Sequence, residues 1–214
     1  MGLERKIAQV LLQKEAVKVK TDPPFTWVSG IKSPVYCDNR KLIGFVDARE
    51  KIIESFKKII DDKDIVFDVV GGTATAAIPW AAFLAQELRK PMIYIRPAKK
   101  EHGAGKQIEG HLEKGSKVLI VEDLISTGGS SVAAANAVRD EGGCEVIDIL
   151  SIVTWEIPKS FDVFAENGLR LTSLTNYSNI IGVASENGDI PADQLETVLD
   201  FKKDPAGWAD KSGL

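Results

Sequence analysis

The sequence predicts an α/β protein built on a mainly parallel sheet that is flanked by helices. Short apolar runs typical of buried strands alternate with longer segments typical of helices along most of the chain. Of the 214 residues, 44% are hydrophobic and 27% are charged, which is the balance of a soluble globular protein. We therefore expect a single domain, residues 1–214, with a core of useful size.

The amino-terminal part of the chain predicts two helices with a small strand region between them. Leu3–Val17 has the periodicity of an amphipathic helix, and a pair of prolines ends it. Residues 25–40 mix aromatic and β-branched residues with glycine and proline, which favours short strands or a hairpin. Asp47–Ile60 is expected to be helical, with Asp47 as its N-cap.

From residue 65 onward, expected strands and helices alternate. The strands are the apolar runs Ile65–Val70, Met92–Ile95, Lys117–Val121, Val146–Val153 and Leu169–Leu174. The helices are Ala74–Leu88, Ser130–Glu141, Ser160–Asn167 and, near the end, Pro191–Phe201. Such alternation indicates a parallel sheet covered on both faces.

Charge and composition weigh against several classes of protein. The net charge is −4 and the pI is about 5.4, whereas a nucleic-acid binder usually carries a basic field. Cys37 and Cys144 match no metal-ligand spacing, and two reduced thiols are expected rather than a disulfide. The amino terminus lacks the apolar core of a signal peptide, and no run could span a bilayer. We expect a cytoplasmic protein with no membrane or nucleic-acid partner.

Between Arg96 and Gly115 the periodicity lapses into a charged, glycine-rich stretch. Long loops inside compact domains are often functional lids. A plain surface hairpin has the same composition, so both interpretations stay open at this point.

The strongest chemical pattern begins where an apolar strand runs into two acids, Glu122 and Asp123. A turn of small residues, Ser126–Ser130, follows and opens a helix. Helix N-termini suit phosphate groups, and ligands of such sheets bind at the carboxyl ends of the strands. Two vicinal hydroxyls of a ribose could donate to the two carboxylates. The pattern therefore predicts a cradle for a ribose 5-phosphate.

A strand, turn and helix without a ligand is the plainer interpretation, because glycine turns after strands are common. The turn lacks the lysine of a P-loop and the GxGxxG spacing of a dinucleotide site, which disfavours both of those classes.

The whole string resembles the PRPP-binding motif of the type I phosphoribosyltransferases, and it reads VLIVEDLISTGGS. The resemblance implies that Glu122 and Asp123 hold the ribose hydroxyls and that Ser126–Ser130 wrap the 5-phosphate. The full set of PRPP-binding residues that it implies is Arg96, Lys100, His102, Glu122, Asp123, Leu124, Ile125, Ser126, Thr127, Gly128, Gly129 and Ser130.

Two further segments narrow the resemblance to the orotate phosphoribosyltransferases. Residues 25–40 resemble their hood, and residues 96–110, which contain KEHGAG, resemble their flexible catalytic loop. This implies the type I phosphoribosyltransferase fold. The hood would comprise about residues 20–45 plus carboxyl-terminal residues, and the core about residues 46–175.

The resemblance also implies the reaction: orotate and PRPP give orotidine 5′-monophosphate and pyrophosphate, with Mg²⁺, in pyrimidine biosynthesis. Arg96, Lys100 and His102 would be the catalytic cations on the pyrophosphate, and no metal ligand is assigned to the protein. A second loop, formed by Gly72, Thr73, Ala74 and Thr75, would also meet the pyrophosphate. A homodimer is expected, whose catalytic loop closes over the neighbouring subunit's site.

For orotate itself, the resemblance implies contacts from Ser126 and Tyr36, and Lys32 is a candidate partner of the carboxylate. The chain departs from some family members, which carry basic residues where this sequence has Val28, Ala76 and Pro97. A purine-type phosphoribosyltransferase and a PRPP-sensing regulator are the alternatives.

Overall fold

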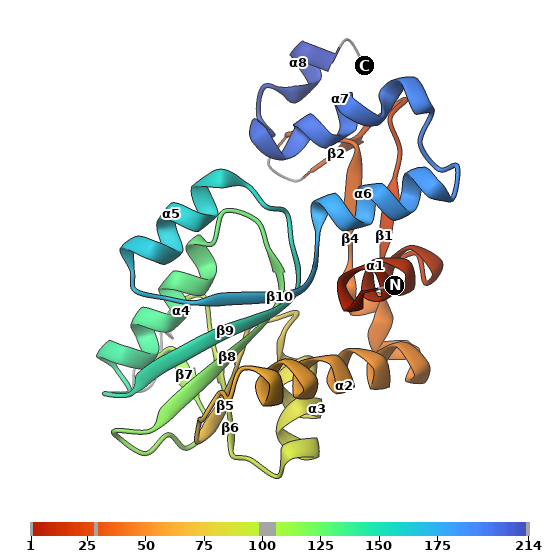
Figure 1. Cartoon of the computed structure of the whole chain (residues 1–214). Coiled ribbons are helices and arrows are strands. Elements are labelled where there is room, and N and C mark those ends of the chain that lie inside the picture. The colour runs from red at the N-terminus through yellow and green to blue at the C-terminus, as the bar shows by residue number, and fades with distance from the viewer. Residues whose placement is uncertain (1, 28–29, 99–105, 213–214) are drawn as a thin grey trace.

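The computed structural model describes residues 2–27, 30–98 and 106–212. Its centre is a six-stranded sheet in the order β10-β9-β8-β5-β6-β7, parallel except for β7 (Figure 1). Its strands are β5 (Val69–Thr73), β6 (Met92–Ile95), β7 (Ile108–Glu109), β8 (Lys117–Ile125), β9 (Glu145–Thr154) and β10 (Leu171–Asn176). The predicted fold class is confirmed.

Helices cover both faces of this sheet, as the alternation along β8 requires. Leu119 and Val121 point into one buried cluster, which also holds apolar side chains of α1 (Leu3–Gln13), α2 (Val46–Asp62) and α3 (Ile78–Leu88). Val118 and Ile120 point into a second cluster, with side chains of α4 (Gly129–Asp140) and α5 (Pro158–Glu166). Successive residues of a strand face opposite sides, so β8 is apolar on both.

The strand order reverses between β5 and β8. The chain goes from β5 to β6 in one direction, and from β8 through β9 to β10 in the other. Ligands of open α/β sheets bind outside the carboxyl ends of the strands at such a switch point. The carboxyl ends of β5 and β8 are Thr73 and Ile125, and the segments that follow them face each other across this point.

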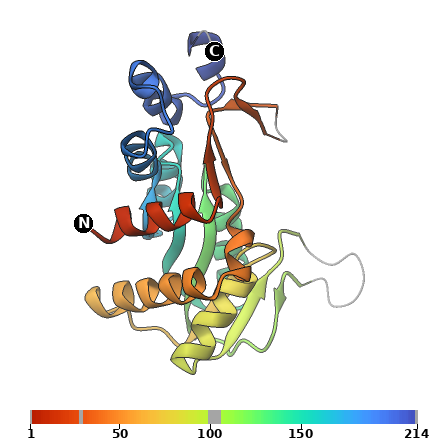
Figure 2. The same ribbon diagram turned by 90° about the vertical axis from the view of Figure 1, so that its right-hand side faces the viewer.

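Two small antiparallel sheets form an upper lobe above the main sheet, together with the chain after residue 190 (Figures 1 and 2). In this upper lobe β1 (Val17–Val19) pairs with β4 (Val35–Cys37), and β2 (Phe25–Thr26) pairs with β3 (Lys32–Ser33). The remaining elements are the 3₁₀ turns η1 (Asn39–Gly44), η2 (Ala192–Gln194) and η3 (Phe201–Lys203), and the helices α6 (Tyr177–Glu186), α7 (Leu195–Asp200) and α8 (Trp208–Ser212).

Aromatic packing ties the upper lobe to the sheet. The ring of Phe201 lies 5.5 Å from that of Trp27 and 5.8 Å from that of Tyr177, centroid to centroid. Tyr177 in turn packs edge-on against Trp155, which follows β9. Aromatic contacts of this kind contribute roughly 0.5–1.5 kcal/mol each beyond area burial. The carboxyl-terminal segment therefore anchors the β2–β3 hairpin to the core.

Several predicted boundaries are corrected. Asp47 is not the N-cap of α2: Phe45 occupies that position, and the Asp47 carboxylate binds Lys14 Nζ at 2.7 Å. The first helix ends at Gln13, and Val17 belongs to β1, because Glu15 has a positive φ of 52°. In α3 the helix begins only at Ile78.

Some elements of the structure were not predicted. The sequence pattern predicts neither α6 nor α8, and the two-residue strand β7 falls in the stretch without periodicity. The expected terminal helix is divided among η2, α7 and η3. No helix in the described ranges has the length and apolar character needed to cross a membrane.

Candidate active site

The two acids lie inside β8 rather than after it, because the strand continues to Ile125. They face a cavity of about 240 Å³ at the switch point between β5 and β8. The residues that line it come from β5 and its loop, the end of β6, β8 and α4. They are Thr73, Ala74, Thr75, Ala76, Ile95, Arg96, Pro97, Glu122, Asp123, Leu124, Ser130, Ala133 and Ala134. The cavity thus brings together residues of three segments that the family resemblance assigned to PRPP: the loop after β5, Arg96 and the acid pair with its turn.

Glu122 is almost fully buried, with 5% of its surface exposed. Its carboxylate oxygen Oε1 accepts a hydrogen bond from the hydroxyl of Ser131 at 2.8 Å. Burial raises the pKa of Glu122 to about 7, and hydrogen bonds from Thr73 and Ser131 oppose the rise. Glu122 therefore changes its charge near neutral pH, which is typical of a functional site.

Asp123 is more open to the cavity than Glu122. Burial raises its pKa above the ordinary value, and the backbone N–H groups of Asp123 and Leu124 partly offset that effect. Its main-chain carbonyl accepts a hydrogen bond from the side-chain amide of Asn39 at 2.8 Å. The second acid is thus in contact with η1, the turn that follows β4.

The turn after β8 is shaped for the entry of α4. Gly128 is its N-cap and has a positive φ of 83°, which a glycine adopts without steric cost. A Cβ at this position would lie 2.9 Å from the ring of Phe164 on α5. Gly129 then begins the helix, and its first backbone N–H groups and the positive end of its dipole suit an anion. Ile125 itself is a core residue, 1% exposed.

The loop after β5 forms the opposite wall of the cavity. Thr73, Ala74 and Thr75 line it, and the Ala74–Thr75 peptide bond is cis. The Ala74 N–H donates to the carbonyl of Ile95 at 2.8 Å, which ties the loop to β6. Gly72 does not line the cavity, and an added Cβ there would lie 2.7 Å from that of Ala81. Glycine at 72 therefore lets α3 pack directly on β5.

Of the three predicted catalytic cations, Arg96 lies within the described residues. It follows β6 and lines the cavity, and its guanidinium Nη1 lies 3.8 Å from Glu109 Oε1 on β7. Its backbone N–H donates to the carbonyl of Gln107 at 2.9 Å. Lys100 and His102, the other two predicted cations, lie outside the described residues, as does Val28.

The three residues predicted to contact orotate do not line the cavity that holds the acids. Tyr36, on β4, is 43% exposed and its ring lies 5.8 Å from that of Phe25. Lys32, on β3, donates from Nζ to the hydroxyl of Thr26 at 2.8 Å across the hairpin. Neither lines the cavity, and neither does Ser126, which directly follows β8.

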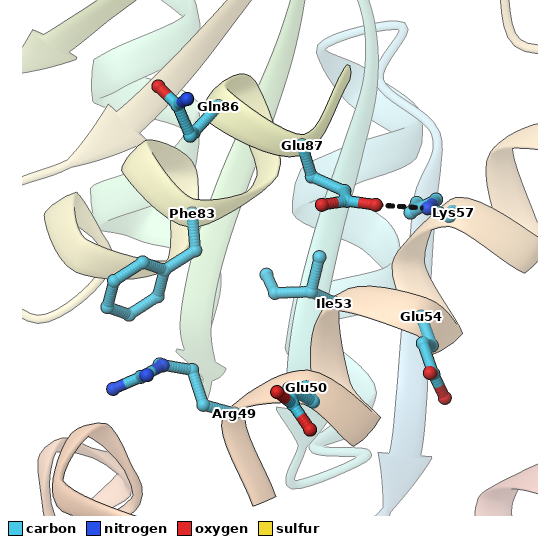
Figure 3. A pocket seen from close by; sticks show the side chains of 8 residues that line it. All are labelled: Arg49, Glu50, Ile53, Glu54, Lys57, Phe83, Gln86 and Glu87. Atoms are coloured by element: carbon cyan, nitrogen blue, oxygen red, sulfur yellow. Dashed lines mark hydrogen bonds and ion pairs between the residues drawn. The ribbon is translucent and has the colours of Figure 1, made fainter. Parts of the chain in front are cut away.

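A second and larger cavity, of about 380 Å³, lies between α2 and α3 (Figure 3), and neither acid lines it. Lys57 and Glu87 form an ion pair of 2.6 Å there, and the guanidinium of Arg49 lies 4.9 Å from the centroid of the Phe83 ring. The sequence motifs described above contribute no residue to its lining, whereas the smaller cavity contains both acids. The smaller cavity is therefore the candidate active site.

Sequence reasoning missed two residues that contact the acids, Asn39 and Ser131. Asn39 lies 84 positions before Asp123, and no local pattern could link them. Ser131 had a weak signal, since it follows the selected turn by one residue. Its contact with Glu122 depends on how α4 leaves the strand. Among the described residues, no group of three or more His, Cys, Asp or Glu side chains could hold a metal ion.

Comparison with known proteins agrees with the fold. Residues 46–162 match the family model of the phosphoribosyl transferase domain. The chain is 46% identical over 208 residues to the orotate phosphoribosyltransferase of Listeria monocytogenes, covering 97% of this chain and 99% of that one. The identity to the Streptococcus thermophilus orotate phosphoribosyltransferase is 45% over 210 residues, covering 98% and 100%.

A solved structure gives the same result. The orotate phosphoribosyltransferase from Aeropyrum pernix superimposes with a TM-score of 0.75 at 31% identity, covering 86% of this chain and 99% of that one. This chain belongs to the orotate phosphoribosyltransferase family, whose members are pentosyltransferases.

Proposed function

We propose that this protein transfers the ribose 5-phosphate of PRPP to orotate, which gives orotidine 5′-monophosphate and pyrophosphate in pyrimidine biosynthesis. One observation carries the proposal. The carboxylates of Glu122 and Asp123 line a single cavity with Ser130, at the turn that opens α4. In a member of this family, that arrangement supports binding of a ribose diol beside its phosphate.

In this proposal the ribose hydroxyls donate to Glu122 and Asp123, since ionised carboxylates only accept hydrogen bonds. The 5-phosphate binds the backbone N–H groups and hydroxyls of Ser126–Ser130, and the α4 dipole favours its charge. Leu124 and Ile125 contribute backbone groups that connect the two parts. Phe164 behind Gly128 supports the turn from the side away from the ligand.

The leaving pyrophosphate gains negative charge as the bond to C1 breaks, so cations stabilise the transition state. We assign this task to Arg96, Lys100 and His102, and the segment Gly72–Thr75 to further contacts with the pyrophosphate. Thr73 and Arg96, which line the same cavity as the acids, support the assignment.

Mg²⁺ typically binds through one or two carboxylates together with substrate phosphates and water. Glu122 and Asp123, the two carboxylates that line the cavity, would be the residues to hold an ion that arrives with PRPP. The ion would neutralise charge on the leaving group.

Orotate is proposed to lie between the upper lobe and the sheet, against Tyr36 and Ser126, with Lys32 as the partner of its carboxylate. The contact of Asn39 with Asp123 supports this, because β4 ends at Cys37, two residues before Asn39. We further propose a hood of about residues 20–45 plus carboxyl-terminal residues over a core of about residues 46–175. A cytoplasmic homodimer whose residue 96–110 loops cover each other's sites completes the proposal.

The ultraviolet absorbance of orotate provides the test. Purified protein is mixed with PRPP and orotate, with and without Mg²⁺, and adenine and xanthine replace orotate in parallel reactions. We expect Mg²⁺-dependent consumption of orotate and no use of either purine. Turnover of a purine base without turnover of orotate would contradict the proposal and favour a purine-type enzyme.

A further inference from the structure

One side chain of η1, the turn that follows β4, reaches the backbone of the acid pair. Asn39 donates from Nδ2 to the main-chain carbonyl of Asp123 at 2.8 Å, across 84 positions of sequence. Asn39 is 1% exposed, although asparagine is seldom fully buried. Burying a polar side chain costs free energy of folding. A role at the site would account for a buried asparagine at this position.

The backbone around Asn39 is fixed on both sides. The Asp38 N–H donates to the carbonyl of Ala16 at 2.7 Å, which continues the pairing of β1 with β4. The Asp38 carboxylate caps η1 by accepting from the Arg40 N–H at 3.2 Å, and it also binds the Arg40 guanidinium Nε at 2.6 Å. Asn39 thus lies at the start of a capped turn and has little freedom to move away from Asp123.

Only one orientation of the Asn39 amide makes this contact. Among the described residues, its Oδ1 is buried and has no hydrogen-bond partner, so the side chain is held by its Nδ2 alone. A rotated amide would direct an oxygen at the Asp123 carbonyl, and two acceptors repel. The bond therefore fixes the position of the Asp123 main chain as well as that of Asn39.

The Asp123 backbone has fewer strand neighbours to hold it than a residue in the middle of β8, so it depends more on the bond from Asn39. On the β5 side, β8 is paired only as far as Val121, the partner of Gly72. Beyond Val121, the described backbone pairing of β8 is with β9 alone. Asn39 reaches the strand from another part of the fold at the point where one neighbouring strand has ended.

We propose that Asn39 is a positioning residue that holds the Asp123 backbone, so that its carboxylate meets the ribose of PRPP. The inference rests on the proposed function and extends it, since it makes PRPP affinity depend on η1, a turn outside the cavity. Asn39 touches no reacting atom in this account and acts only through Asp123.

Asn39→Ala removes the bond and tests the inference. We expect the KM for PRPP to rise by about fivefold to tenfold, which corresponds to the loss of one hydrogen bond. The KM for orotate and kcat should change by less than about twofold. The matched control is Asn167→Ala: Asn167 Nδ2 also donates to a main-chain carbonyl at 2.8 Å, that of Val163, away from the cavity. It should leave all three constants unchanged.

Asn39→Asp is the second variant, for the case that Asn39→Ala does not fold at the assay temperature. The side chain keeps its shape but offers only acceptors to the Asp123 carbonyl, so the KM for PRPP should rise at least as much. An unchanged KM for PRPP would overturn the inference. So would an equal rise of KM for both substrates, because that would show a general loss of structure.

The two proposals can fail separately. If wild-type protein consumes no orotate, the proposed function fails, and calorimetric titration of PRPP into the same variants still measures whether Asn39 supports PRPP binding. If wild type is active and Asn39→Ala binds PRPP as tightly as wild type, only the role of Asn39 is wrong.

Discussion

The hydroxyl of Ser131, in the first turn of α4, donates to Oε1 of Glu122 on β8 at 2.8 Å. The helix that opens the proposed phosphate site therefore also stabilises the charge of one proposed ribose acid. Burial acts in the opposite direction and raises the pKa of Glu122 to about 7. The balance between these two effects decides how much of Glu122 is ionised at neutral pH.

Ser131→Ala should shift the pH dependence of PRPP use. In the wild type we expect the KM for PRPP to fall as the pH rises through about 7, because the ionised carboxylate is the better acceptor. Without the Ser131 hydroxyl the pKa of Glu122 should rise further, and the midpoint should move up by about one pH unit. Kinetic measurements from pH 5.5 to 9 would show this.

A matched control for that variant is Ser160→Ala. The buried Ser160 hydroxyl donates to the carbonyl of Ile157 at 2.7 Å in α5, and it contacts neither acid. We expect Ser160→Ala to lower stability without moving the midpoint. If both variants moved the midpoint equally, the effect could not come from Glu122.

Glu122→Gln should make the protein more stable at alkaline pH. The folded protein keeps the proton on Glu122 up to about pH 7, whereas the unfolded chain releases it near 4.5. Between these values the folded state binds more protons, so the free energy of unfolding of the wild type falls as pH rises. Glutamine does not titrate. The stability of the variant relative to wild type should therefore increase by on the order of 2–3 kcal/mol between pH 4 and 8.

Urea unfolding at both pH values measures this difference. The same variant should use PRPP poorly, since stabilising changes at functional sites often reduce activity. A stability difference that does not change with pH would mean that Glu122 does not titrate in this range.

Gly128→Ala should disrupt the turn that opens α4. The new Cβ would lie 2.9 Å from Phe164, and alanine disfavours the φ of 83°. We expect a loss of about 2–3 kcal/mol of stability, together with a higher KM for PRPP. Gly188→Ala is the control, because Gly188 has a φ of 82° and nothing within 4 Å of an added Cβ. It should cost only about 1 kcal/mol. Equal losses in thermal unfolding would show that the contact with Phe164 is irrelevant.

The central sheet could be predicted from the sequence because its signals are local. Strands such as Val146–Val153 are continuous apolar runs, and the structure extends that strand by only one residue at each end, to Glu145–Thr154. The prediction that the strand before the acids ends at Val121 is wrong. Polar residues such as Glu122 normally mark a strand's end, but here pairing with β9 keeps the backbone extended to Ile125. A hydrogen-bonded neighbour outweighs local preference.

Features set by distant contacts were not predictable. The helix α6 contains Gly182 and short polar residues, which gave no clear period, yet Tyr177 and Ile180 of this helix are fully buried in the fold. The Asp47 N-cap prediction is wrong because α2 already begins at Val46, which places Asp47 within the helix, where its carboxylate binds Lys14 from 33 positions earlier. At the site, the acids and the turn have a sequence pattern, whereas Asn39 acquires its contact only because the fold brings η1 against β8.

Lys100→Ala tests the cation that the family resemblance makes most important. We expect kcat to fall by about two orders of magnitude, as when a group that stabilises transition-state charge is removed. Near-normal turnover would show that this assignment is wrong.

A mixture of subunits tests whether the site is shared. If the loop of one subunit covers the site of its partner, mixing inactive Lys100→Ala and Asp123→Asn chains should restore part of the activity. The mixed dimer would then contain one site with both residues intact. Activity no greater than the sum of the separate variants would contradict a shared site.

The most direct test is a crystal structure with PRPP and Mg²⁺ bound. The account predicts the ribose hydroxyls within about 3 Å of the Glu122 and Asp123 carboxylates, and the 5-phosphate on the N–H groups of Ser126–Ser130. PRPP bound with its pyrophosphate on that turn, or in another cavity, would contradict it.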